Sequence, residues 1–185
     1  MSESAATIFR RFRAMPNSER IASEFALAGI MRWAKRSNRR AMDIGVGLGT
    51  VTAAIRSVSD RLVVGVERYP GFRGDALPSL GKAVGFGPFE LVVLDDSAET
   101  HDLRSLVHEL HVHAVVLIEG NRPCERGAVV AGLQHIRRAH VVATWRPKDR
   151  SKGYTVALCD PRWWERAWFL GVRLREGWLD MMARA

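Results

Sequence analysis

Short apolar runs recur along the chain, and most of the segments between them have helical periodicity. The runs are continuous rather than alternating in polarity, which is typical of strands buried on both faces of a sheet. They cover 40–44, 61–66, 89–94, 114–118, 140–144 and 154–159, and the helices expected between them cover 49–58, 76–84, 103–110 and 125–136. This alternation predicts an α/β fold with a doubly wound, mostly parallel sheet and helices on both faces.

The N-terminal part departs from this alternation. Residues 1–17 are polar and basic, and we expect a mobile arm or a loose helix there. The polar residues 17–20 indicate the start of a helix that runs to about Lys35, with Trp33 lying off its apolar face. We therefore expect an N-terminal arm and cap helix over 1–37, followed by a Rossmann-like domain over 38–185, within a single domain overall.

The C-terminal part is short for a full domain of this kind. The last two strands are separated only by 145–153, a segment with proline and glycine that suits a hairpin, so the fold is somewhat truncated. Residues 161–170 predict a helix that begins at proline and carries three tryptophans. Core packing, a homodimer interface and nucleobase stacking are the alternatives for these tryptophans, and 172–185 is either a helix or a strand pair.

The strongest chemical signal is the segment DIGVGLGT at 43–50, between the first strand and a helix. Gly45 permits a tight turn, Gly47 lets the backbone approach a ligand closely, and Gly49 permits close packing of the helix on the strand. A structural turn remains the alternative interpretation of this loop.

Acidic residues follow the next two strands. Glu67 ends the second strand, at the distance from Asp43 where a carboxylate holds ribose hydroxyls in dinucleotide-type folds. The turn LDDSAE at 94–99 follows the third strand. Because ligands bind at the carboxyl edge of an open parallel sheet, these signals predict one site at that edge.

The DxGxGxG spacing and the turns LDDSAE (94–99) and LIEGNRP (117–123) resemble the class I S-adenosylmethionine-dependent methyltransferases. More narrowly, they resemble the small O-methyltransferase-like group, over about residues 38–145. The resemblance implies S-adenosylmethionine as cofactor, with its methionine part cradled by Asp43, Gly45, Gly47 and Gly49. It also implies that Glu67 holds the ribose and that Asp96 with Ser97 meets the adenine.

The same resemblance places Glu119, Gly120 and Asn121 beside the methyl group and the substrate. Glu119 is the candidate catalytic base, because it ends the fourth strand at the cofactor edge. Trp145 and Arg146, just after the fifth strand, are candidates for the substrate pocket. The metal-dependent members have an aspartate after the fourth strand and an Asp-Asn pair after the fifth, whereas this chain has Glu119 and Thr144-Trp145-Arg146. We therefore expect no metal.

Charge and composition widen the choice of partners. The net charge of +8 favours acidic partners, but the basic residues are scattered. Two cysteines, no signal peptide and no apolar stretch of about 18 residues predict a cytoplasmic protein with reduced thiols and no membrane partner. The expected function is metal-independent methyl transfer to a small-molecule hydroxyl. The alternatives are a non-catalytic cofactor-binding or assembly protein with the same fold, and a nucleic-acid methyltransferase.

Overall fold

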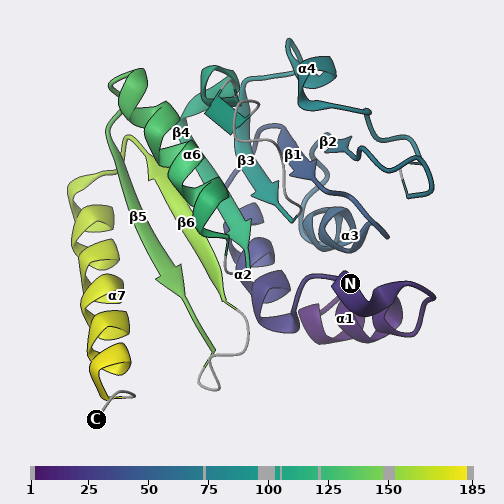
Figure 1. Ribbon diagram of the computed structural model, residues 1–185, viewed down its shortest axis with the longest axis horizontal. Helices are drawn as coiled ribbons and strands as arrows, with labels where there is room; N and C mark the ends of the chain where they lie inside the picture. The colour runs from purple at the N-terminus through teal and green to yellow at the C-terminus, as the bar shows by residue number, and fades with distance from the viewer. Residues whose placement is uncertain are drawn as a thin grey trace.

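In a computed structural model, the chain folds around one six-stranded sheet with the strand order β2-β1-β3-β4-β6-β5 (Figure 1). The structure describes residues 3–72, 74–95, 103–104, 106–120, 122–147 and 153–182. The strands are β1 Ala41–Ile44, β2 Val63–Val66, β3 Phe89–Leu94, β4 Leu110–Glu119, β5 His140–Trp145 and β6 Tyr154–Cys159. The first four strands pair in parallel and β6 runs antiparallel to both of its neighbours, so the predicted α/β class with a mostly parallel sheet is confirmed.

Helices cover both faces of this sheet. The α-helices are α1 Ala5–Arg13, α2 Glu24–Ala34, α3 Thr50–Arg56, α4 Leu80–Ala83, α6 Pro123–His135 and α7 Trp163–Met182, and the 3₁₀ helices are η1 Ser18–Arg20 and η2 Val107–Glu109. One apolar core packs α1, α2, α3 and α7 on one face, and a second packs α4, η2 and α6 on the other. Burial on both faces explains the continuous apolar strands.

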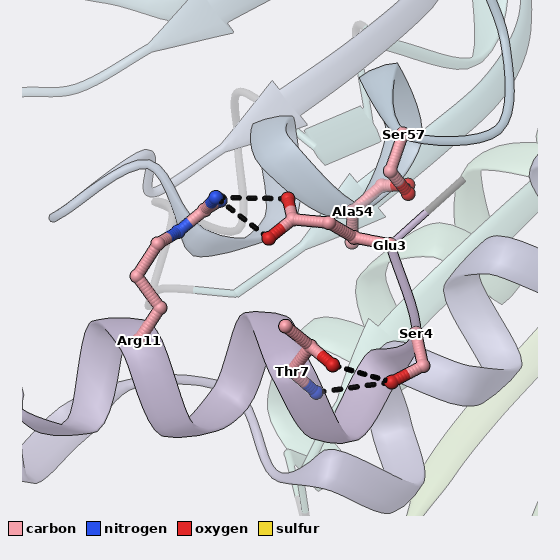
Figure 2. A network of polar contacts seen from close by, with 6 residues as sticks. All are labelled: Glu3, Ser4, Thr7, Arg11, Ala54 and Ser57. Atoms are coloured by element: carbon pink, nitrogen blue, oxygen red, sulfur yellow. Dashed lines mark hydrogen bonds and ion pairs between the residues drawn. The ribbon is translucent and has the colours of Figure 1, made fainter. Parts of the chain in front are cut away.

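The N-terminal segment forms a regular helix rather than the expected mobile arm or loose helix. Ser4 Oγ accepts the N–H of Thr7 at 3.1 Å, and Arg11 Nη1 lies 2.8 Å from both carboxylate oxygens of Glu3 (Figure 2). The buried side chains Ile8 and Phe12 belong to the core shared with α2 and α3. This packing orders a segment whose composition alone is polar and basic.

The predicted start of the second helix at 17–20 is wrong. Asn17 has a left-handed φ of 61°, and Ser18–Arg20 makes only a 3₁₀ turn. Helix α2 begins at Glu24, where Ser23 Oγ accepts the N–H of Ala26 at 3.2 Å. Ser23 is thus a regular N-cap, which satisfies a backbone N–H that the helix itself leaves unpaired.

The helix expected over 76–84 is shorter than predicted. Leu77 instead forms a parallel bridge with Val66, on the side of β2 away from β1. Pro78 follows, and a residue before proline is disfavoured in the helical region, so α4 begins only at Leu80.

The helix expected over 103–110 is also replaced in part. Its last residues form η2, and β4 begins at Leu110, four residues before the predicted strand start at Ala114. The pairing of β3 with β4 shifts register between Phe89 and Leu91, which accommodates this early start. Residues 101, 102 and 105 lie outside the described ranges.

At the C-terminal end, β5 and β6 pair in an antiparallel manner, as expected for the short connection between them. The tail is one helix to Met182, which decides between the two interpretations of 172–185. Core packing is wrong for Trp163, which is 76% exposed, whereas Phe169 is buried. No helix in the described residues is long and apolar enough to cross a membrane.

Candidate functional site

The glycine loop after β1 is held in shape by Glu67. Gly45, Gly47 and Gly49 all have positive φ, at 86°, 49° and 86°, a region that favours glycine. The N–H of Gly47 donates to Glu67 Oε2 at 2.9 Å, and the N–H of Tyr69 donates to Glu67 Oε1 at 2.8 Å. Glu67 therefore joins the loop after β1 to the end of β2. Each of its carboxylate oxygens still has a lone pair for a further donor.

Asp43 lies beneath this loop and is fully buried. Its Oδ2 accepts the hydroxyl of Thr52 at 2.5 Å, whereas Oδ1 has no hydrogen-bond partner among the described residues. The pKa of Asp43 is raised from 3.8 to about 6, chiefly by burial and to a lesser extent by the negative charge of Glu67, against the hydrogen bonds from Thr52, which lower it. The hydroxyl of Thr50, at the start of α3, also lacks a partner in the described part of the chain.

A cavity of about 520 Å³ opens over the carboxyl ends of β1, β2 and β3. The residues that line it are Asn17, Ile21, Gly45, Val46, Gly47, Leu48, Thr50, Glu67, Tyr69, Phe72, Asp95 and Arg122. Its volume falls within the roughly 300–1,000 Å³ that small-molecule sites span. The sheet order reverses between β1 and β3, and this switch point is where open α/β sheets bind ligands.

Two acidic side chains meet where β3 and β4 end. Asp95 lines the cavity and is hydrogen-bonded to Glu119, which lies in β4 and is 6% exposed. Arg122 holds the two strand ends together, because its Nη2 donates to the carbonyl of Asp95 at 2.7 Å and its Nε to the carbonyl of Glu119 at 3.1 Å.

The surroundings of Asp95 favour its protonated form. Burial raises the pKa of Asp95 well above its ordinary range, and the charges of Glu119 and Asp43 add to that effect. Glu119 Oε1 accepts the N–H of Ser23 at 3.3 Å, at the N-terminus of α2. This contact joins the end of β4 to the residue that caps α2. Asp95 Oδ1 is a third buried atom with no partner among the described residues.

Asp95 is the site residue that sequence reasoning missed. The turn LDDSAE indicates this edge of the sheet, but the resemblance assigns the two residues after Asp95 instead. The sequence does not reveal that β3 lies between β1 and β4, which brings Asp95 to the wall of the cavity. Asp96 and Ser97, expected at the adenine, and Asn121, expected beside the substrate, lie outside the described residues.

The remaining predicted residues are distributed over two places. Gly45, Gly47 and Glu67 line the cavity, with Asp43 and Gly49 next to lining residues, and Glu119 lies behind Asp95. Trp145 and Arg146 line a second cavity, of about 680 Å³, between α2, the β5–β6 hairpin and α7.

Trp145 is 9% exposed and packs among other aromatic rings at this second cavity. It stacks on Tyr154 with ring centroids 5.7 Å apart and meets Phe169 edge-on at 5.3 Å. Arg146 pairs with Glu176 at 4.0 Å. These contacts join the hairpin to α7, so both residues have a packing role here.

Among the described residues, the acidic groups around the first cavity do not assemble into a larger cluster. Within the described ranges, no group of three or more His, Cys, Asp or Glu side chains is placed to hold a metal ion. Asp95 and Glu119 are bonded to each other.

The sheet order and the glycine loop define a class I methyltransferase fold, and solved structures agree. The chain is similar to the O-methyltransferase TomG from Streptomyces achromogenes, with 15% identity over 87% of this chain and 91% of that one and a TM-score of 0.59. It is also similar to the O-methyltransferase from Bacillus cereus, with 13% identity, 85% and 90% coverage and a TM-score of 0.60.

The chain is also similar to a methyltransferase from Geobacter sulfurreducens, with 12% identity over 86% of this chain and 91% of that one and a TM-score of 0.61. At these identities the likeness concerns the fold alone. No family model matches the chain, and no curated protein matches it in sequence.

Proposed function

We propose that this protein is an S-adenosylmethionine-dependent methyltransferase that acts on a hydroxyl group of a small molecule without a metal ion. The observation that supports this most is the set of three buried polar atoms without partners in the described residues, on Asp43, Thr50 and Asp95. Thr50 and Asp95 line one cavity, and Asp43 lies directly beneath its glycine loop. Buried polar atoms are normally hydrogen-bonded, so such a group is suited to a polar ligand.

The residues around the cavity fit the parts of this cofactor. The ammonium of a methionine moiety can donate to the acidic side of the loop, where Asp43 Oδ1 is unsatisfied. Glu67 keeps acceptor capacity for ribose hydroxyls. Tyr69 and Phe72 line the cavity with partly exposed aromatic rings, which offer flat apolar surface to a nucleobase. The solved Streptomyces and Bacillus enzymes were crystallised with S-adenosylmethionine and its demethylated product, respectively.

The Asp95–Glu119 pair supplies the base. When bound, S-adenosylmethionine supplies the electrophilic methyl group. Asp95 Oδ1 accepts the proton of the acceptor hydroxyl, and the proton that Asp95 already holds passes to Glu119. The pair would thus take up one proton as the oxygen forms its bond to the methyl carbon and the bond from that carbon to sulfur breaks, with its electron pair left on sulfur. Arg122 keeps the two carboxyl groups adjacent.

A small acceptor without a metal is part of the same proposal. Asp95 and Glu119 are bonded to each other, and Trp145 and Arg146, at the end of β5, stand where the metal-dependent members of the group have oxygen ligands. The N-terminal residues Asn17 and Ile21 cover the cavity from one side and limit the size of an acceptor.

Calorimetry with S-adenosylmethionine and S-adenosylhomocysteine tests cofactor binding directly. We expect both to bind, and no binding of either would contradict the proposal. Transfer of tritium from labelled cofactor into a hydroxyl-containing metabolite fraction tests catalysis, with Asp95→Asn as the control that binds cofactor but transfers poorly. Binding without transfer to any fraction would favour a non-catalytic cofactor-binding protein, and label in nucleic acid would favour the third alternative.

A further inference from the structure

Helix α7 carries an exposed apolar stripe along its whole length. Trp163, Leu170, Leu174, Trp178 and Met181 recur at helical spacing on the side away from the buried Phe169, and each is between 55% and 76% exposed. Trp164 and Met182 widen the stripe at its ends, with 47% and 56% exposure. The helix has 20 residues, so the stripe is about 30 Å long. Contiguous apolar surface of this kind marks an interaction site.

The stripe faces outward from the end of the molecule. Helix α7 lies along β5, the edge strand of the sheet, at the outer side of the fold and far from α1 (Figure 1). A Cβ atom added at Gly171 or Gly177 would meet no neighbouring atom within 4 Å, so the outer side is open along its length.

Arginines lie on both flanks of the stripe. Arg166 and Arg173 line the hollow between α7 and β5, and Arg175 lines the cavity on the other side of the helix. Arg162, just before the helix, places its guanidinium 5.2 Å from the ring centre of Trp164. All four arginines are exposed.

The described acidic side chains of α7 are turned away from the stripe. Glu165 Oε2 accepts the N–H of Arg162 at 2.7 Å, and Glu176 is 9% exposed and faces Arg146. The surface is thus an apolar band between cationic borders, on a chain with a net charge of +8. Its partner should be apolar in the middle and anionic at both sides.

We propose that the outward stripe of α7 binds the surface of an anionic lipid bilayer, with the helix lying in the plane of the interface. Amphipathic helices of this type place tryptophan and leucine in the acyl boundary and arginine at the lipid phosphates. The sequence predicts no membrane partner because no apolar stretch is long enough to span a bilayer. A helix that lies on the bilayer surface needs no spanning segment. The inference does not depend on methyl transfer.

Charge makes a second copy of the chain a poorer occupant. If two α7 helices packed stripe to stripe, the arginines of one copy would face those of the other, because both flanks carry them.

Nucleic acid is also a poorer fit to this surface than a lipid bilayer. A phosphate backbone needs cations on the contact surface, whereas the centre of the stripe is Leu170, Leu174 and Met181.

Co-sedimentation of the full chain with vesicles tests the proposal. We expect binding to phosphatidylcholine vesicles that contain phosphatidylglycerol, weak binding to phosphatidylcholine alone, and loss of binding as salt is raised. Brominated lipid should quench the tryptophan fluorescence of the unmodified protein. Arg166→Ser with Arg173→Ser should lower the partition coefficient about 30-fold, since each basic residue near an anionic surface contributes about fivefold.

Two leucines provide a matched comparison. Leu170 on the stripe and Leu62 before β2 are both 55% exposed. Leu170→Gln should weaken vesicle binding by about tenfold, whereas Leu62→Gln should leave it unchanged, and circular dichroism should find both folded.

Equal binding by the two leucine variants would overturn the proposal, as would absence of binding and quenching with the unmodified protein. The proposal would also be overturned, in favour of self-association, if the unmodified protein did not bind vesicles and light scattering found it to be a dimer that Leu174→Gln converts to a monomer. Retention of single-stranded RNA that depended on the stripe, without vesicle binding, would overturn it in favour of nucleic acid.

Discussion

The side chain of Asp95, the residue after β3, is hydrogen-bonded to that of Glu119, the last residue of the neighbouring parallel strand β4. Asp95 faces the cavity and Glu119 lies behind it, next to the N-terminus of α2. A single proton keeps both carboxyl groups together in a buried place, because two adjacent buried negative charges would repel strongly.

Replacing Glu119 with Gln should lower the pKa of Asp95, because the negative charge that raises it is removed. Carboxyl NMR titration of the free protein measures this without any substrate. In the unmodified protein one aspartate should keep its proton well above the usual range, and in the variant it should ionise at lower pH. An unchanged titration would mean that burial alone sets the pKa of Asp95.

The pKa of Asp43 predicts a pH dependence of stability. Folded Asp43 holds its proton up to about pH 6, whereas the unfolded chain releases it near 3.8. Folding therefore takes up a proton between these values, and the stability from this group falls as pH rises through that window. The loss is about 3 kcal/mol, since each pKa unit corresponds to about 1.4 kcal/mol.

Urea unfolding at pH 4 and pH 7 measures this loss by comparison with Asp43→Asn, which retains an acceptor for Thr52 but does not ionise. Relative to Asp43→Asn, the unmodified protein should have a higher free energy of unfolding at pH 4 than at pH 7. A constant difference would show that Asp43 is ionised throughout.

Gly47→Val should abolish cofactor binding. Gly47 has a φ of 49°, where a side chain costs about 1–2 kcal/mol and a β-branched one more, and its N–H must still reach Glu67. Calorimetry with S-adenosylhomocysteine checks this. Gly127→Ala is the control, because Gly127 lies in α6 with open space around it, and this variant should bind normally. Normal binding by Gly47→Val would remove the loop from the site.

Glu67→Ala should lower cofactor affinity by about 1–3 kcal/mol, the range for hydrogen bonds to a charged acceptor. Glu90→Ala is a matched control. Glu90 Oε2 also accepts two backbone N–H groups, from Asn38 and Arg39 at 2.6 and 2.8 Å, but it does not line the cavity. Both variants should lose stability on heating, and only Glu67→Ala should lose affinity. Equal affinities would assign Glu67 to loop structure alone.

Gly29→Ala should destabilise the protein by about 1–3 kcal/mol, as overpacked cores do. A Cβ atom at Gly29 would come within 2.5 Å of the Tyr154 ring, which is also stacked on Trp145 and has little room to move. Urea unfolding should find Gly171→Ala, on the open side of α7, no less stable than the unmodified protein. If both variants were equally stable, the aromatic contact would be looser than the structure has it.

Much of the fold was predictable from local pattern. The strands Phe89–Leu94 and Tyr154–Cys159 were predicted to the residue, because apolar β-rich runs between turn residues leave little choice of conformation. The glycine loop was also predictable, since the three positive φ values need residues without a Cβ. The conformations of Leu77 and of residues 17–20 were not, because bridge formation and packing on α1 outweigh local propensity there.

The class of fold, the glycine loop and the acidic residues at the carboxyl edge could be inferred from the order of the amino acids, because periodicity and glycine placement are local properties of the chain. The identity of neighbouring strands emerges only when the chain is folded. That arrangement brought Asp95 against Glu119, moved Trp145 and Arg146 to a second cavity, and buried Trp33 while leaving Trp163 exposed. The physical reason is that strand order and helix docking depend on contacts between residues far apart in sequence, which no local pattern specifies.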